Sequence, residues 1–362
     1  MEKELEKKKE PEKKKRILWM FRTNLRPLEY YHRYKHLDEF KSRCHDFYLL
    51  MCLWYLENDF VDEVYVWRLK PQIEYHRYED VRDIVFNVAG KSFIQKFVSS
   101  FYECLDNPKY KEVKPTISFF RGGFPEYCAV TKRQPAFFGN SLYLGAGRRV
   151  YPQYGGRYRK LLVESDEDLK HSQTFPFFKT ANRSIFHPVE NRTEKYDLCW
   201  ICNFSEINFK GQEYFINEVS KSEFLKGIKI IHIGNQPEKG IDLCEKSGVS
   251  NINFLGYLTR PEVNKFLNES KLAIITSNEN DGSPRVVTEI LMSGTPLIIR
   301  AKTRLLSFYK ERGVIEFSDS EVDKKIEEGL SRSSNLKKEV LENISNISIG
   351  NICNINFKLW NQ

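Results

Sequence analysis

No stretch of the 362-residue chain contains about 18 consecutive apolar residues, the length that a membrane-spanning helix requires. Residues 1–16, MEKELEKKKEPEKKKR, are charged where a secretory signal peptide carries an apolar segment. Internal repeats of about 20 to 50 residues are also missing, so the sequence does not predict a solenoid or a propeller. We therefore expect a cytoplasmic protein of ordinary globular architecture.

The cysteines lack the spacing of a disulfide framework. All eight are scattered through a long chain, which is typical of reduced thiols in a protein core. One pair, Cys199-x-x-Cys202, has the spacing of a redox or metal-binding motif, but no second pair exists. It also falls in a predicted buried strand, where residues three apart point to opposite faces, so we interpret both as core residues.

Positive charge is not concentrated along the folded part of the chain. Lysines and arginines number 57 against 49 aspartates and glutamates, which gives a net charge of +8. Part of that excess lies in residues 1–16, and the rest forms no basic stripe of the kind that nucleic acids bind. We therefore expect no nucleic-acid partner. The mild positive balance suits small anionic substrates or an anionic membrane surface.

Residues 1–16 are predicted to be a disordered charged tail, because they contain too few apolar side chains to offset the entropy lost on ordering. Two interpretations are open. One is a solubilising arm. The other is peripheral membrane contact through the basic residues, each contributing about 1 kcal/mol near an anionic surface.

Length and composition suffice for two domains. With 41% hydrophobic and 14% aromatic residues, the chain can bury two cores of ordinary size. Short apolar runs separated by helical stretches indicate strands buried on both faces of a parallel sheet, as in Rossmann-like α/β domains. In the first half of the chain these runs are residues 17–21, 63–67, 84–88, 116–120, 136–144 and 161–163.

A second series of runs follows the polar stretch 186–194, which we interpret as an interdomain linker. Its predicted strands are 198–201, 229–233, 252–255, 272–276 and 297–299, and its predicted helices are 261–268, 284–292, 324–330 and 336–344. We predict an N-terminal domain over 17–190 and a C-terminal domain over 191–345. For the remaining tail, 346–362, one candidate arrangement is that it packs back on the N-terminal domain.

The most informative segment is 277–296, SNENDGSPRVVTEILMSGTP, which predicts a strand end, a loop, a helix and a return to a strand. Ser283 is a suitable N-cap and Pro284 a suitable first helical residue. A helix that begins at the carboxyl edge of a parallel sheet directs free amides toward a bound anion, phosphate above all. Asp281 precedes this helix and Glu289 lies within it, so the two carboxylates are placed to contact different hydroxyl-bearing parts of one ligand.

This segment resembles the acidic-x7-acidic signature of glycosyltransferase family 4, the glycosyl transferases group 1, written E-G-F-G-x4-E-A-M-A-x-G-x-P. Asp281 and Glu289 stand at the two acids, Gly282 at the first glycine, and Gly294 and Pro296 at the closing pair. Two residues depart from the pattern: Asp replaces the first Glu, and Pro284 replaces the second Gly. The resemblance implies that Glu289 holds the donor ribose and that Asp281 lies near the transferred sugar.

The donor-binding residues implied by the resemblance extend around this helix start: Gly282, Ser283, Pro284, Arg285 and Val286. A second interpretation of Glu289 is an i,i+4 salt bridge with Arg285, worth a few tenths of a kcal/mol.

Other segments match the same family at the expected spacing. Lys210-Gly211 stands where the family has a Lys-Gly that binds the diphosphate, and Asn203 replaces its usual Arg, so Arg285 is a candidate for the missing charge. Gly234 and Tyr257 fall in loops that lie near the nucleobase in the family. Lys210 has a second interpretation as a solvated lysine at a helix start.

In the N-terminal half the resemblance is one of topology. Arg121-Gly122-Gly123 ends a predicted strand and is a candidate for a catalytic or acceptor contact, with a plain turn as the equal alternative. Tyr143 is a further acceptor-side candidate, and Arg148 and Arg149 are weaker ones. The family's histidine after strand 136–144 is missing. Asp166-x-Asp168 has the spacing of a metal-binding D-x-D motif, but we interpret it as helix-start acids.

The resemblance implies the α/β fold called GT-B, in which two Rossmann-like domains face each other across a cleft. It also implies a retaining, metal-independent transfer from a nucleoside-diphosphate sugar, with Asp281, Lys210 and Arg121 as catalytic candidates and no cofactor. The acceptor is a glycan, lipid or protein. Two alternatives stay open: a non-catalytic nucleotide-sugar-binding protein, favoured by the missing histidine and by Asn203, and a nucleotide-sugar epimerase.

Overall fold

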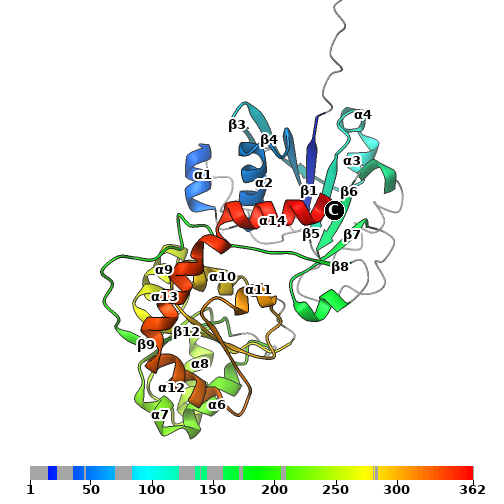
Figure 1. Ribbon diagram of the computed structural model, residues 1–362. Coiled ribbons are helices and arrows are strands. Elements are labelled where there is room, and N and C mark those ends of the chain that lie inside the picture. Colours follow the sequence, from blue (N-terminus) through cyan, green and yellow to red (C-terminus); the bar gives the residue numbers. More distant parts are fainter. Residues whose placement is uncertain are drawn as a thin grey trace, which may run out of the picture.

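The computed structural model describes residues 15–22, 36–44, 46–69, 84–121, 135–138, 140–144, 158–170, 174–204, 209–279, 281 and 284–361. Two bodies, each built around a mainly parallel sheet, make up this part of the chain (Figure 1). We call them the N-terminal and C-terminal bodies. The prediction of two α/β units is confirmed, and it follows from apolar runs that are buried on both faces of a sheet.

The N-terminal body contains an eight-stranded sheet in the described residues, with the order β3-β4-β2-β1-β5-β6-β7-β8. Its strands are β1 (Ile17–Arg22), β2 (Glu63–Leu69), β3 (Ile84–Val88), β4 (Lys91–Val98), β5 (Ile117–Arg121), β6 (Asn140–Leu144), β7 (Lys160–Val163) and β8 (Thr174–Pro176). Its helices are α1 (Leu37–Arg43), α2 (Phe47–Glu57), α3 (Glu103–Asp106), α4 (Pro108–Lys111), and the 3-10 turns η2 (Pro135–Phe138) and η3 (Asp166–Lys170).

Two predictions for this body were wrong. Strand β3 is antiparallel to β4, whereas a parallel strand was predicted. The hairpin was not recognised because its tight turn has Ala89, with φ of 51°, in place of the usual Asn. The predicted strand 136–144 is a 3-10 turn followed by the shorter β6. Ordered contacts also begin earlier than predicted, since the Arg16 guanidinium pairs with Asp62 at 3.3 Å.

The C-terminal body contains a six-stranded parallel sheet in the described residues, with the order β11-β10-β9-β12-β13-β14. Its strands are β9 (Tyr196–Ile201), β10 (Ile230–Ile233), β11 (Ile252–Phe254), β12 (Ser270–Ile275), β13 (Leu297–Arg300) and β14 (Val314–Phe317). Its helices are α6 (Gln212–Lys221), α7 (Glu223–Gly227), α8 (Pro237–Ser247), α9 (Arg260–Asn268), α10 (Arg285–Met292), α11 (Ser307–Lys310), α12 (Val322–Ser331) and α13 (Ser333–Asn343). Strand β14 was not predicted.

The last helix returns to the N-terminal body. After α13 and the 3-10 turn η4 (Ile344–Ile347), α14 (Ile349–Asn361) packs against α2 (Figure 1). The hydroxyl of Tyr55 donates to Cys353 O at 3.1 Å, and Asn140 Nδ2 donates to Trp360 O at 2.8 Å. Trp360 is fully buried among aromatic rings. The two ends of the described chain therefore stabilise the same body.

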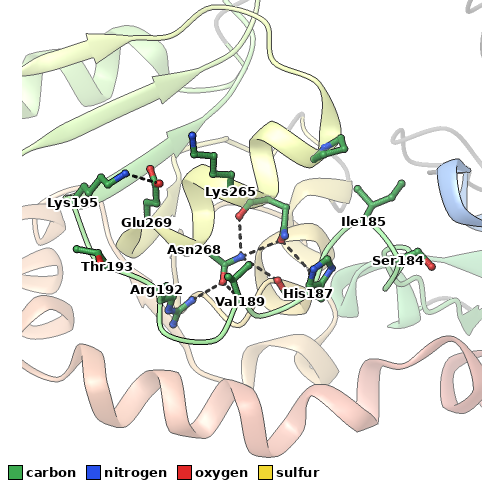
Figure 2. A pocket seen from close by; sticks show the side chains of 12 residues that line it. Ser184, Ile185, His187, Val189, Arg192, Thr193, Lys195, Lys265, Asn268 and Glu269 are labelled. Carbon is green, nitrogen blue, oxygen red and sulfur yellow. Dashed lines mark hydrogen bonds and ion pairs between the residues drawn. The ribbon is translucent and has the colours of Figure 1, made fainter.

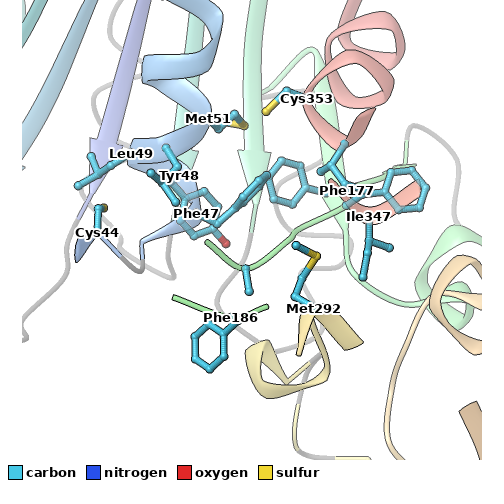
Figure 3. Packing of buried hydrophobic residues seen from close by; sticks show 14 of the residues in the cluster. Cys44, Phe47, Tyr48, Leu49, Met51, Phe177, Phe186, Met292, Ile347 and Cys353 are labelled. Atoms are coloured by element: carbon cyan, nitrogen blue, oxygen red, sulfur yellow. The ribbon is translucent and has the colours of Figure 1, made fainter. Parts of the chain in front are cut away.

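One hydrophobic cluster connects the two bodies. It runs from Phe47 and Tyr48 of α2, through Phe177 and Phe186 of the connecting segment, to Met292 at the end of α10 (Figure 3). The rings of Tyr48 and Phe177 stack with centroids 5.8 Å apart. Burial of apolar surface stabilises a fold by roughly 25 cal/mol per Å². The apolar contacts of this cluster therefore hold the segment that joins the bodies in place.

Candidate functional site

The candidate site lies at the carboxyl edge of the C-terminal sheet. Strand β9 pairs in parallel with both β10 and β12, so the loops that follow these three strands meet at one edge. Lys210 lies between β9 and α6, Gly234 follows β10, and Asp281 lies between β12 and α10. Ligands of open α/β sheets bind at such edges.

Lys210 and Asp281 form an ion pair across two of these loops. The distance between Lys210 Nζ and Asp281 Oδ2 is 2.6 Å, and the two side chains are 24% and 11% exposed. The Asp281 backbone N–H donates to Asn278 O at 3.0 Å, and the N–H of Asn278 donates to Phe209 O at 2.9 Å. The two loops are therefore held together by backbone and side-chain bonds.

The Lys-Gly pair of the sequence motif has a structural reason. Gly211 has φ of 71°, and a Cβ at this position would collide with Thr276 O at the end of β12. Thr276 Oγ1 donates to Lys210 O at 2.7 Å and accepts from the indole of Trp200 at 3.1 Å. Because glycine permits this close approach, the backbone of Lys210 is fixed against β12.

Asn203 connects the loops that follow β9 and β10. Its side-chain oxygen accepts from the backbone N–H of Asn235 at 2.9 Å, and its backbone oxygen accepts from Gln212 Nε2 at 2.7 Å. Gly234 lies where a Cβ would collide with Cys202 O. Asn203 was predicted to take the place of an arginine at the diphosphate, and in the structure its side-chain oxygen is bonded to the loop after β10.

Glu289 on α10 is buried and pairs with Arg260 at the start of α9. The distance between Arg260 Nη1 and Glu289 Oε2 is 3.0 Å, and the glutamate side chain is 4% exposed. The alternative of an i,i+4 salt bridge with Arg285 is wrong. Arg285 forms no ion pair with any residue in the described part of the chain.

The start of α10 differs by one residue from the prediction. The helix begins at Arg285, and Pro284, with ψ of 130°, occupies the N-cap position that was predicted for Ser283. Gly282 and Ser283 lie outside the described residues. Val286 is half-buried in the first turn, and Tyr257, in the loop after β11, is 66% exposed.

Two charged residues of the site were not found by sequence reasoning. Lys179, in the segment that joins the bodies, pairs with Glu164, which follows β7, at 2.8 Å, and both side chains are nearly buried. Burial lowers the pKa of Lys179 below its usual value, the ion pair with Glu164 opposes that shift, and the guanidinium groups of Arg121 and Arg285 add to it.

Arg121 ends β5 at this place. Its Nε donates to the hydroxyl of Tyr48 at 2.6 Å, and its guanidinium lies 5.3 Å from the centroid of the same ring. The adjacent Gly122 and Gly123 lie outside the described residues, as do Arg148 and Arg149. The positive charges of Arg121, in the N-terminal body, and of Arg285, in the C-terminal body, both lower the pKa of Lys179.

Tyr143 requires a correction. It is only 2% exposed and its ring stacks on Tyr158 with centroids 4.7 Å apart, inside a core cluster of the N-terminal body. Strand β6 is buried on both faces, so alternation along it gave no sign of which side chains face the site. We therefore assign Tyr143 to the core and not to an acceptor contact.

The Asp166-x-Asp168 segment contacts the C-terminal body. Asp166 Oδ2 accepts from the Ser307 backbone N–H at 2.7 Å, and Asp168 forms an ion pair with Arg304. These acids join the two bodies. In the described residues, no group of three or more His, Cys, Asp or Glu side chains is arranged to hold a metal ion.

A cavity of about 440 Å³ lies between α9 and the segment from Ser184 to Lys195 (Figure 2). Its polar groups hold the linker: Val189 N donates to Asn268 Oδ1 at 2.8 Å, and Asn268 Nδ2 donates to His187 O at 3.1 Å. Lys195 and Glu269 pair at 2.7 Å. None of the predicted donor residues lines this cavity, so we interpret it as a gap beside the connecting segment and not as the donor site.

Cys199 and Cys202 are both buried and belong to different hydrophobic clusters. Burial raises the pKa of each thiol above its usual value. Neither is therefore activated as a thiolate.

Among the helices of the described residues, none is both long and apolar enough to cross a bilayer.

Part of the chain matches a known family. Residues 189–340 match the model of the family described as glycosyl transferases group 1. A search of curated protein sequences found no match. The matched range contains Lys210, Asp281, Arg285 and Glu289.

Solved structures share the fold of almost the whole chain. Sucrose-phosphate synthase from Thermosynechococcus elongatus is 12% identical, with 96% of this chain and 99% of that chain covered and a TM-score of 0.64. Trehalose 6-phosphate synthase from Burkholderia multivorans is 9% identical, with 96% and 98% covered and a TM-score of 0.63. HepE of Anabaena, solved in complex with UDP, is 9% identical, with 95% and 98% covered and a TM-score of 0.60. The chain therefore has the GT-B fold, and its residues 189–340 are similar to the glycosyl transferases group 1.

Proposed function

We propose that this protein transfers a sugar from a nucleoside-diphosphate sugar to an acceptor, with retention of configuration and without a metal ion or other cofactor. One observation carries the proposal: Lys210, Asp281, Arg285 and Glu289 gather around the loop between β12 and α10, within the part that matches the family. The nucleotide sugar is thus proposed as the substrate. A glycan, lipid or protein serves as the acceptor, and the reaction is proposed to take place in the cytoplasm.

The diphosphate is proposed to bind at the start of α10. Its negative charge is offset by the guanidinium of Arg285, the ammonium of Lys210 and the free amides of the first turn. As the bond between the anomeric carbon and the phosphate oxygen breaks, the diphosphate leaves with the bonding electrons. Fixed positive groups stabilise that growing charge more than they stabilise the ground state.

The two carboxylates are proposed to hold different parts of the donor. Glu289, buried within α10, accepts hydrogen bonds from the ribose hydroxyls. Asp281 contacts a hydroxyl of the transferred sugar, and its ion pair with Lys210 orients it. Tyr257 and Gly234, in the loops that follow β11 and β10, are proposed to contact the base.

Arg121 and Lys179 are proposed to act from the N-terminal side. The charges of Arg121 and Arg285 both lower the pKa of Lys179, which supports a second set of contacts to the donor phosphate or to the acceptor. The Asp166 and Asp168 carboxylates are already engaged by Ser307 and Arg304, which supports a reaction without a metal ion.

A non-catalytic nucleotide-sugar-binding protein is the second candidate. The bracing role of Asn203 favours it, because the side chain that replaces an arginine is used to hold a loop. The two candidates differ in turnover and not in binding.

Release of free nucleoside diphosphate from UDP-, GDP- and ADP-sugars tests the proposal. A nucleotide sugar at 100 times its dissociation constant is expected to stabilise the fold by about 2.7 kcal/mol, and its turnover is expected to release the diphosphate. Stabilisation without release, with a panel of glycan and lipid acceptors present, would support the binding protein. No stabilisation by any nucleotide sugar would refute both.

A further inference from the structure

We propose that Arg260 is a positioning residue for the nucleotide, acting through Glu289. This inference rests on the proposed function and names a residue outside the acidic signature. Arg260 is the first residue of α9, whereas Glu289 lies on α10, 29 positions later in the sequence. The two side chains meet with Nη1 3.0 Å from Oε2.

The two side chains of this ion pair differ in how far they are buried. The Glu289 side chain is 4% exposed, whereas that of Arg260 is 33% exposed. A buried carboxylate without a counter-charge is costly, because water no longer solvates it. Arg260 therefore supplies the counter-charge to a carboxylate that has lost most of its contact with solvent.

The pair leaves half of the carboxylate free for a ligand. Arg260 occupies Oε2, and no residue in the described part of the chain donates to Oε1. A planar guanidinium held against one oxygen sets the plane of the carboxylate, which directs the other oxygen. Ribose offers two adjacent hydroxyl groups, and recognition of both depends on that orientation.

The start of α9 is held rigidly, which a positioning role requires. The Thr259 backbone N–H donates to Glu262 Oε2 at 2.8 Å, which caps the helix just before Arg260. Ser293 Oγ donates to Asn264 Oδ1 at 2.7 Å and lies 2.9 Å from Glu289 O, so α9 and α10 are bonded to each other.

Helix α9 is also fixed to the segment that joins the bodies. Asn264 Oδ1 accepts from His187 N at 3.2 Å, and Asn268 binds the neighbouring backbone (Figure 2). Arg260 therefore lies on a helix that is hydrogen-bonded both to α10 and to the connecting segment. Its guanidinium is bonded to Glu289, and groups placed in this way hold a ligand-binding side chain in the orientation that the ligand needs.

The test measures binding of UDP, GDP and ADP, and of the 2′-deoxy form of the tightest of them, by calorimetry. Arg260→Ala is expected to weaken the ribonucleotide about tenfold, because a hydrogen bond to a charged group is lost. It is also expected to reduce the preference for the ribonucleotide over its 2′-deoxy form. Arg260→Lys is expected to restore much of the affinity, since the charge remains, and less of the ribose preference, since an ammonium group is not planar.

Two further variants separate positioning from a general effect on the fold. Lys265→Ala removes a positive charge from the same helix, where the ammonium lies 5.7 Å from the Phe266 ring, and it is expected to bind like the parent. Adding Arg260→Ala to Glu289→Ala is expected to cause no further loss, because Arg260 acts through Glu289. Melting temperatures of all variants show whether each one is folded.

Three results would overturn the inference: parental affinity and parental ribose preference in Arg260→Ala, tighter binding in that variant, or a full additional loss in the double variant. Tighter binding would mean that Arg260 blocks Glu289. If the parent binds no nucleoside diphosphate, the proposed function fails and this inference with it. A parent that binds while Arg260→Ala behaves as the parent leaves the proposed function standing and refutes only the role of Arg260.

Discussion

Lys210 Nζ lies 2.6 Å from Asp281 Oδ2, so the cation proposed for the diphosphate and the carboxylate proposed for the sugar hold each other in place. Lys210→Ala is expected to lower kcat about 100-fold, because a fixed positive group matters most as the diphosphate leaves. Affinity for the nucleotide sugar is expected to fall less than about tenfold, because the charge of the leaving diphosphate has not yet developed in the bound donor. Initial rates and calorimetry on the same preparation measure the two effects.

Lys221→Ala is the matched control for that prediction. Lys221 lies on α6, close to Lys210 in sequence, and pairs with Glu218 at 2.9 Å on the surface. Its removal is expected to leave kcat and affinity within about twofold of the parent, because exposed ion pairs contribute little. A loss of affinity in Lys210→Ala as large as its loss of kcat would contradict a role in the transition state.

Chelation is expected to leave turnover unchanged. The charge on the diphosphate is offset by Lys210, Arg285 and the first turn of α10, while Asp166 and Asp168 are bonded to Ser307 and Arg304. Rates with EDTA, and after addition of magnesium or manganese, measure this. Activity that EDTA abolishes and either metal restores would instead assign Asp166 and Asp168 to a metal site.

His232 on β10 is expected to make stability depend on pH. It is fully buried beside the rings of Trp200, Phe204 and Phe254, and burial lowers its pKa from 6.5 to about 4. Because the folded-state pKa is depressed, the unfolded chain binds the proton more readily. The contribution of neutral His232 to the free energy of unfolding is therefore fully present above about pH 6.5. It is lost as the pH falls toward 4, which lowers the free energy of unfolding by up to about 3 kcal/mol.

Urea unfolding at pH 7 and pH 4.5 measures this effect in the parent and in His232→Phe, which keeps an aromatic ring in the same cluster. The variant is expected to lose less stability than the parent between the two values. His187→Gln, at an exposed histidine of the linker, serves as the control. An equal loss in His232→Phe and the parent would show that other groups cause the pH dependence.

Local patterns made much of this architecture predictable. The alternation of apolar runs with helices predicted the two sheets, and the 277–296 segment placed Asp281 and Glu289 on a loop and a helix at a sheet edge. These residues are near in sequence to the elements that position them. Lys210-Gly211 was predicted from its resemblance to the Lys-Gly segment of the family, and the structure gives the reason for the glycine, since a Cβ at Gly211 would collide with Thr276 O.

Contacts between distant segments were not predictable from one sequence. Arg260 pairs with Glu289 from another helix. Lys179 pairs with Glu164, and its pKa is lowered by the charges of Arg121 and Arg285, only because of how the two bodies are arranged. Tyr143 was misassigned because a strand buried on both faces shows no alternation. Patterns of hydrophobicity report burial within an element, and they carry no information on which element lies opposite.

The most direct measurement compares the binding of one nucleotide sugar and its free nucleoside diphosphate to Glu289→Ala and Asp281→Ala. Glu289→Ala is expected to weaken both ligands alike, by about tenfold or more, because the proposed ribose contact is common to them. Asp281→Ala is expected to weaken the nucleotide sugar while leaving the free diphosphate near its parental affinity. If both variants bind both ligands like the parent, the donor site is not where this structure places these two carboxylates.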